Sequence, residues 1–159
     1  MPWHIGIDPG SRCVGLAAIR EDGKIRYQAF HATGELQDRF VQIRQHVRSW
    51  LSPLADEGVW NVVIEQPGTR HGGVALLGSF GVVLEATRSL LKDTVIHELP
   101  SASWKRLALG TGAATKAEVM EAAHRLGYPR SQNWQDIADA LCIAKAAMVL
   151  IEANKDVAA

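Results

Sequence analysis

The order of apolar segments along this chain restricts its fold strongly. Residues 3–8, 13–20 and 24–31 are short apolar or alternating segments, separated by the turn sequences P-G-S-R and E-D-G-K. We predict three consecutive antiparallel strands from them. The later segments alternate between helical and strand patterns, so the predicted order is β-β-β-α-β-α-β-α-α, with no internal repeat.

The segments after the third strand differ in period and length. Five apolar residues recur at spacings of four and three and predict an amphipathic helix that ends near Pro53: Leu36, Phe40, Ile43, Val47 and Trp50. Strands are predicted at 60–65 and 94–99, and helices at 73–91, 101–108, 115–126 and 134–153. Together the segments predict an α/β fold, in which helices flank a five-stranded mixed sheet whose first three strands are antiparallel. With 159 residues we expect a single domain, 1–159.

Composition narrows the class of protein. The 17 basic and 17 acidic residues cancel, which counts weakly against nucleic-acid binding, although a basic rim around an acidic centre also gives a neutral total. Cys13 and Cys142 form no zinc or redox motif, so we expect reduced thiols. We see no signal peptide, and the longest uncharged apolar run, 72–84, has thirteen residues, too few to span a membrane. These features predict a cytoplasmic protein.

Carboxylates stand at the ends of apolar segments. Asp8 closes the first predicted strand and Glu65 the fourth, while Asp136 and Asp139, three residues apart, share one face of the final helix. Clustered carboxylates bind hard divalent cations, and an oxygen-only ligand set favours Mg²⁺ or Mn²⁺ over zinc. The sequence therefore predicts a metal-dependent enzyme that cleaves phosphodiester bonds.

Four sequence motifs carry a family resemblance. I-G-I-D-P-G-S-R-C-V-G-L-A at 5–17 resembles the opening of the RuvC family of Holliday junction resolvases, in the ribonuclease H-like superfamily. In the same order, I-E-Q at 64–66, W-K-R-L-A-L-G-T-G-A-A-T-K at 104–116 and D-I-A-D-A-L-C-I-A at 136–144 resemble the family's later motifs. Four motifs in the same order over most of the chain favour common ancestry over chance or convergence.

The resemblance implies a site and a reaction. Asp8, Glu65, Asp136 and Asp139 would ligate two Mg²⁺ or Mn²⁺ ions, one activating the attacking water and the other stabilising the leaving oxygen. The substrate would be a four-way (Holliday) DNA junction, resolved by paired nicks. Lys116 would be catalytic, its ammonium offsetting charge at the scissile phosphate. Six basic residues, Lys116 among them, are the expected DNA contacts. They are Arg12, Arg70, His71, Lys105, Arg106 and Lys116.

The chain departs from the family pattern at Gly68. Family members commonly carry an aromatic residue there, which stacks at the opened centre of the junction. Junction opening would therefore use other residues here, with Arg70 or His71 as stacking or phosphate contacts. The segment G-G-V-A-L-L-G-S-F-G-V-V-L-E-A at 72–86 resembles the family's dimer-forming helix. Two strands of a symmetric junction require two facing active sites, so we expect a homodimer.

Three other functions compete with this prediction. A related nuclease family acts on structured pre-ribosomal RNA, but its pattern lacks the glutamate at Glu65 and the paired final aspartates. An actin-like ATP-binding fold needs a second domain, and a non-cleaving junction-binding protein does not need four acids. The five tryptophans, at 3, 50, 60, 104 and 134, are predicted to pack in the core or at its rim rather than to stack on bases.

Overall fold

The computed structural model describes residues 1–68 and 73–158, and within them five strands form one mixed sheet in the order β3-β2-β1-β4-β5. The antiparallel part consists of β1 (Trp3–Pro9), β2 (Cys13–Ile19) and β3 (Ile25–His31). Two further strands, β4 (Val59–Gln66) and β5 (Val95–Pro100), continue the sheet parallel to β1. The predicted fold class and strand directions are confirmed.

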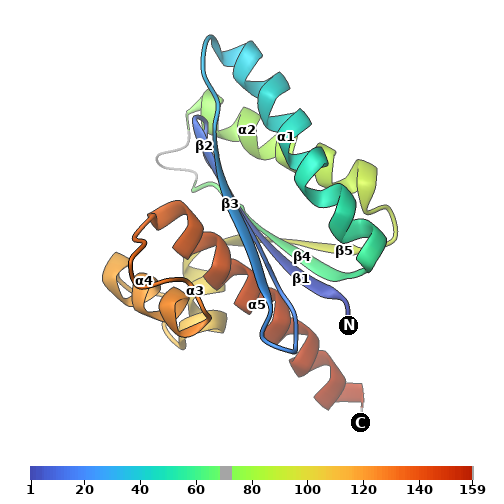
Figure 1. Ribbon diagram of the computed structural model, residues 1–159, viewed down its shortest axis with the longest axis vertical. Helices are drawn as coiled ribbons and strands as arrows, with labels where there is room; N and C mark the ends of the chain where they lie inside the picture. Colours follow the sequence, from blue (N-terminus) through green and yellow to red (C-terminus); the bar gives the residue numbers. More distant parts are fainter. Residues whose placement is uncertain (69–72, 159) are drawn as a thin grey trace.

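Helices cover both faces of this sheet (Figure 1). On one face lie α1 (Leu36–Glu57) and α2 (Val74–Leu90), which pack against each other and enclose an apolar cluster around Ile5, Ile7 and Ile64. On the other face lie α3 (Ser101–Leu109), α4 (Lys116–Arg125) and the long α5 (Gln135–Ala158). Among the described residues, no helix combines the length and apolar character needed to cross a membrane.

The first helix extends beyond the predicted end at Pro53. It continues to Glu57 and ends at Gly58, which has a φ of 98° and whose N–H donates to the carbonyls of Leu54 and Ala55. Leu51 and Leu54, on either side of the proline, are fully buried against the sheet. Burial of these two side chains stabilises the last turn by more than the missing proline hydrogen bond costs.

Two glycines allow α5 to lie directly on the sheet. A Cβ on Gly6 in β1 would stand 2.2 Å from the backbone nitrogen of Ala144, and one on Gly15 in β2 would stand 2.2 Å from the carbonyl oxygen of Asp136. Any side chain at these positions would push the helix away, since such distances are far below van der Waals contact. The glycines therefore fix the height of α5 above the sheet, and with it the position of Asp136.

Candidate active site

The four predicted acids lie at one edge of the sheet, on the side covered by α5. Asp8 and Glu65 directly follow Ile7 and Ile64, which pair across the parallel strands β1 and β4. Because side chains alternate along a strand, both carboxylates point to the face opposite the buried isoleucines. Asp136 and Asp139 occupy the first turns of α5, which crosses β1 and β2 there. The structure thus brings together all four residues that the sequence analysis selected.

Asp8 stands at the electrostatic centre of the group. Burial raises the pKa of its carboxyl well above the usual range, and the charges of Glu65, Asp139 and Asp136 raise it further. Like charges in a partly desolvated site disfavour ionisation, and a bound cation would reverse that effect. A bound cation would therefore stabilise the ionised carboxylates of this site.

Glu65 is held by a tryptophan. The indole nitrogen of Trp104, in α3, donates a 2.6 Å hydrogen bond to Oε2 of Glu65. Burial raises the pKa of Glu65, the Trp104 hydrogen bond partly offsets that rise, and Asp139 adds to it. Trp104 is itself fully buried, so its packing fixes the direction from which it holds the carboxylate.

Asp139 is positioned within its own helix. The side-chain amide of Gln135 donates a 2.8 Å hydrogen bond to Oδ1 of Asp139, one turn further along α5. Burial raises the pKa of Asp139, and this hydrogen bond acts in the opposite direction. Gln135 thus holds the orientation of Asp139, as Trp104 holds that of Glu65.

Both predicted lysines lie within electrostatic reach of the acids. The charge of Lys105 lowers the pKa of Glu65 and of Asp139, and Lys116 lowers that of Asp139. Lys116 is the first residue of α4, whose start is fixed by a capping box in which Thr115 and Glu118 bond each other's backbone N–H. Its exposed ammonium lies on a rigid helix start beside the site.

Cys13 is a neighbour of the acids that the sequence reasoning did not select. Burial, a hydrogen bond from the thiol to Asp136 and the charge of Asp136 together raise the pKa of Cys13 to about 12. The thiol is therefore protonated at neutral pH and acts as a donor to the carboxylate. Trp104 and Gln135 were missed as well, because their roles depend on contacts between elements or turns that no spacing rule reports.

The donor set fits hard divalent cations. Carboxylate oxygens are the ligands that Mg²⁺ and Mn²⁺ prefer, and burial together with three neighbouring carboxylates raises the pKa of Asp8. In the arrangement described for 1–68 and 73–158, no three Asp, Glu, His or Cys side chains converge closely enough to share one ion. Binding of one ion by three or more of these acids therefore requires their side chains to move closer together.

The remaining predicted DNA contacts are distributed unevenly. Arg12 is exposed in the β1–β2 turn beside the site, and the exposed Arg106 points from α3 towards Gly112. Arg70 and His71 lie outside the described residues. Gly68, just beyond β4, is exposed, and a Cβ added there would meet no atom of the described residues within 4 Å. Within the part of the chain that the structure describes, the position of Gly68 is therefore open.

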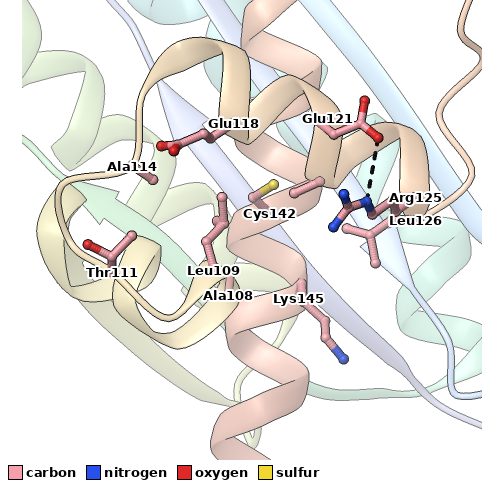
Figure 2. Close-up of a pocket in the computed structure, with 11 residues that line it drawn as sticks. Ala108, Leu109, Thr111, Ala114, Glu118, Glu121, Arg125, Leu126, Cys142 and Lys145 are labelled. Carbon is pink, nitrogen blue, oxygen red and sulfur yellow. Dashed lines mark ion pairs between the residues drawn. The ribbon is translucent and has the colours of Figure 1, made fainter.

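A separate cavity of about 460 Å³ lies between α3, α4 and α5 (Figure 2). Cys142 forms part of its wall, and the ion pair between Arg125 and Glu121 stands at its rim. None of the four acids lines it. This hollow is therefore distinct from the carboxylate site.

The fold and the acidic edge together define a class of protein. The Thermus thermophilus RuvC structure superposes with a TM-score of 0.77 over 94% of this chain and 95% of the other, at 23% identity. The T. thermophilus RuvC structure in complex with a Holliday junction substrate gives 0.76 over 97% of both chains, at 20% identity. The yeast mitochondrial Holliday junction resolvase Ydc2 gives 0.55 at 11% identity. The chain has the ribonuclease H-like fold of these proteins.

Sequence comparison identifies the family. The family model described as "Crossover junction endodeoxyribonuclease RuvC" matches residues 4–147. The protein of that name from Coxiella burnetii (strain RSA 493 / Nine Mile phase I) is 31% identical over 150 residues, covering 88% of this chain and 83% of the relative. That from Sorangium cellulosum (strain So ce56) is 32% identical over 149 residues, covering 88% and 80%. The chain belongs to the RuvC family, which confirms the resemblance seen in its motifs.

Proposed function

We propose that this protein is a structure-selective endodeoxyribonuclease that resolves four-way DNA junctions by metal-dependent hydrolysis in paired nicks. The observation that carries the proposal is the acidic edge, where Asp8 has neighbouring carboxylates from β4 and α5 and a raised pKa. Membership of the RuvC family supports the choice of DNA junctions over structured RNA. Asp8, Glu65, Asp136 and Asp139 would hold two Mg²⁺ or Mn²⁺ ions, which supply Lewis acidity to a phosphodiester when bound.

The chain's own residues orient the reacting groups. Trp104 and Gln135 restrict the orientation of Glu65 and Asp139, so these two carboxylates would meet a bound cation from defined positions. Lys116 would contact the scissile phosphate and stabilise the charge that develops on its oxygens. Lys105, whose charge reaches both Glu65 and Asp139, would limit the repulsion between the carboxylates and a DNA backbone.

We infer that the active form is a homodimer built on α2. Val74 and Leu77 of α2 are 81% and 54% exposed, and Val41 of α1 is 56% exposed. A groove of about 430 Å³ between α1 and α2 includes Gly81, where an added Cβ would meet nothing within 4 Å. Apolar side chains beside an open glycine suit the close approach of a second helix, and a two-fold dimer would direct two sites at two strands.

Gly81 also provides a test of this interface. A leucine at this open position fits the monomer, but it would fill the groove that the partner needs. We expect Gly81→Leu to sediment as a monomer with an unchanged circular dichroism spectrum and to lose paired nicking. An exposed position in the turn between β2 and β3, as in Lys24→Leu, provides the matched control. A dimer in both variants would rule out this surface.

The proposed partner is branched DNA, contacted by Arg12, Arg106 and the two lysines. A cytoplasmic location suits a DNA-processing enzyme whose two described cysteines are unpaired. Because the chain has no net charge, we expect DNA phosphates to bind to the local group of basic residues at the rim of the site.

The decisive assay uses a synthetic immobile four-way junction. We expect symmetric paired nicks on the junction in the presence of Mg²⁺ or Mn²⁺, with linear duplex, flap and structured RNA left uncut. Cleavage of the RNA in preference to the junction would favour the pre-ribosomal RNA nuclease function. Binding of the junction without nicks under any metal condition would favour a non-cleaving binding protein.

A further inference from the structure

An exposed aromatic pair stands beside the carboxylates and belongs to no part of the function proposed above. The rings of His31 and Trp134 stack with centroids 5.3 Å apart and an interplanar angle of 26°. Trp134 is 47% exposed, although Trp3 and Trp104 are completely buried. His31 is also exposed. Because much of their ring surface faces solvent, the two rings stabilise the fold less than buried rings of the same size would.

Separate elements hold the two rings in place. His31 is the last residue of β3 and pairs with Cys13 across the antiparallel ladder. The backbone N–H of Trp134 donates to the hydroxyl of the buried Tyr128 at 3.1 Å, and its carbonyl accepts the 3.1 Å bond from Ala138 that opens α5. Both residues are therefore anchored through the backbone, so their rings are preorganised rather than loosely packed.

The pair lies on the same rim as the acids. Trp134 comes two residues before Asp136, at the start of the same helix. Cys13, which faces His31 in the register, donates its thiol hydrogen to Asp136. The exposed Arg12 adjoins the pair as well, because its carbonyl accepts a 2.7 Å bond from the N–H of Ala32. Aromatic surface, a cation and the carboxylates thus occupy neighbouring positions.

We propose that His31 and Trp134 form a stacking platform for a nucleobase beside the scissile phosphate. The inference rests on the proposed function, which places a phosphodiester at the acids. Every base has a π-face, so stacking on an aromatic ring tolerates any sequence, while the guanidinium of Arg12 would hold the neighbouring phosphate. A base inside a regular duplex already stacks on its neighbours. The platform therefore selects an unpaired or frayed nucleotide at the cut site, which a branch point supplies and a linear duplex does not.

The test measures binding of the cleavage-deficient Asp8→Asn protein to a four-way junction by fluorescence anisotropy. Adding Trp134→Ala should weaken binding about tenfold, the order expected for the loss of one base–aromatic stack, and Trp134→Phe should retain most of the affinity. Trp60 provides a matched control, because it is 44% exposed at the opposite end of its strand from Glu65. Trp60→Ala should change the affinity less than about twofold, and thermal unfolding checks that each variant is folded.

An abasic scan across the nucleotides flanking the cut separates stacking from general weakening. At one position, an abasic nucleotide should lower the junction affinity of the Asp8→Asn protein about tenfold. The same nucleotide should hardly change the affinity of the protein that also carries Trp134→Ala, because that protein already lacks the stacking contact. Equal losses in both proteins at every position, or equal effects of Trp134→Ala and Trp60→Ala, would overturn the platform. Failure of the proposed function would differ, since native protein would then leave the junction uncut.

Discussion

The indole nitrogen of Trp104 donates a 2.6 Å hydrogen bond to the carboxylate of Glu65, joining α3 to the end of β4 inside the acidic site. This bond lowers the pKa of Glu65 against the rise that burial causes. Trp104→Phe keeps most of the buried ring and removes only the donor. We expect the acidic limb of the pH–rate profile to move to higher pH in this variant. An unchanged profile with a lower rate would indicate a packing role alone.

Metal binding should stabilise the folded protein. The pKa values of Asp8, Glu65 and Asp139 are raised on folding, so the folded state holds protons more tightly than the unfolded state. The unfolding free energy therefore falls as pH rises from about 4 through the folded pKa values, and at neutral pH the ionised cluster destabilises the fold. Mg²⁺ or Mn²⁺ at a hundredfold excess over Kd should return about 2.7 kcal/mol, visible as a higher Tm.

Asp139→Asn provides the matched comparison for metal-linked stability. It removes one of the repelling charges, so at neutral pH the variant without added metal should melt above the native protein. Its rise in Tm on adding Mn²⁺ should be smaller, because one ligand is lost. A native protein whose Tm does not respond to millimolar Mg²⁺ or Mn²⁺ would exclude tight metal binding to the folded state.

Lys116 should act on the reaction rather than on affinity. Its charge lowers the pKa of Asp139 from the first turn of α4, where the capping box holds the backbone. Lys116→Gln should lower the cleavage rate by about 10²-fold, the order found when one donor to a developing oxyanion is removed. Junction affinity should fall only slightly. The exposed Lys92 provides a control. If Lys92→Gln lowers the cleavage rate as much as Lys116→Gln does, Lys116 has no specific role in the reaction.

Close contact between β1 and α5 should make Gly6 intolerant of any side chain. In Gly6→Ala the new methyl group would stand 2.2 Å from the backbone nitrogen of Ala144, so α5 must shift and carry Asp136 and Asp139 with it. We expect a loss of about 1–3 kcal/mol of stability in thermal unfolding, together with loss of cleavage. Gly68→Ala, at an exposed position with open space, should leave Tm unchanged. Similar Tm values for both variants would contradict the packing described for α5.

A buried histidine should give the fold a separate pH dependence. His4 Nδ1 lies 2.9 Å from Asn61 Oδ1, while Nε2 is buried and has no hydrogen-bond partner among the described residues. Burial lowers the pKa of His4. Near pH 6.5 the histidine therefore binds a proton in the unfolded chain but stays neutral in the folded chain. Stability is then lost as pH falls below about 6.5, by at most about 1.4 kcal/mol per pH unit. The slope of unfolding free energy against pH should be smaller in His4→Gln, and equal slopes would refute this assignment.

The sequence predicted the sheet well because strands and turns depend on local patterns, and the four acids that it selected lie together in the structure. Strand-closing carboxylates such as Asp8 and Glu65 are visible in a single strand, and the topology then brings them together. The helix end at Pro53 was wrong because propensity does not include the burial of Leu54 against the sheet. The hydrogen bond from Trp104 to Glu65 and the stacking of His31 on Trp134 join distant segments, and only the packed structure reveals them.

Comparing cleavage with binding in Asp8→Asn tests the central claim most directly. The substitution removes the charge at the electrostatic centre of the site while keeping the shape of the side chain. Native protein should nick the immobile four-way junction symmetrically with Mn²⁺, and Asp8→Asn should bind the same junction with similar affinity without cutting it. Cleavage by Asp8→Asn at the native rate would contradict a reaction carried out at these carboxylates.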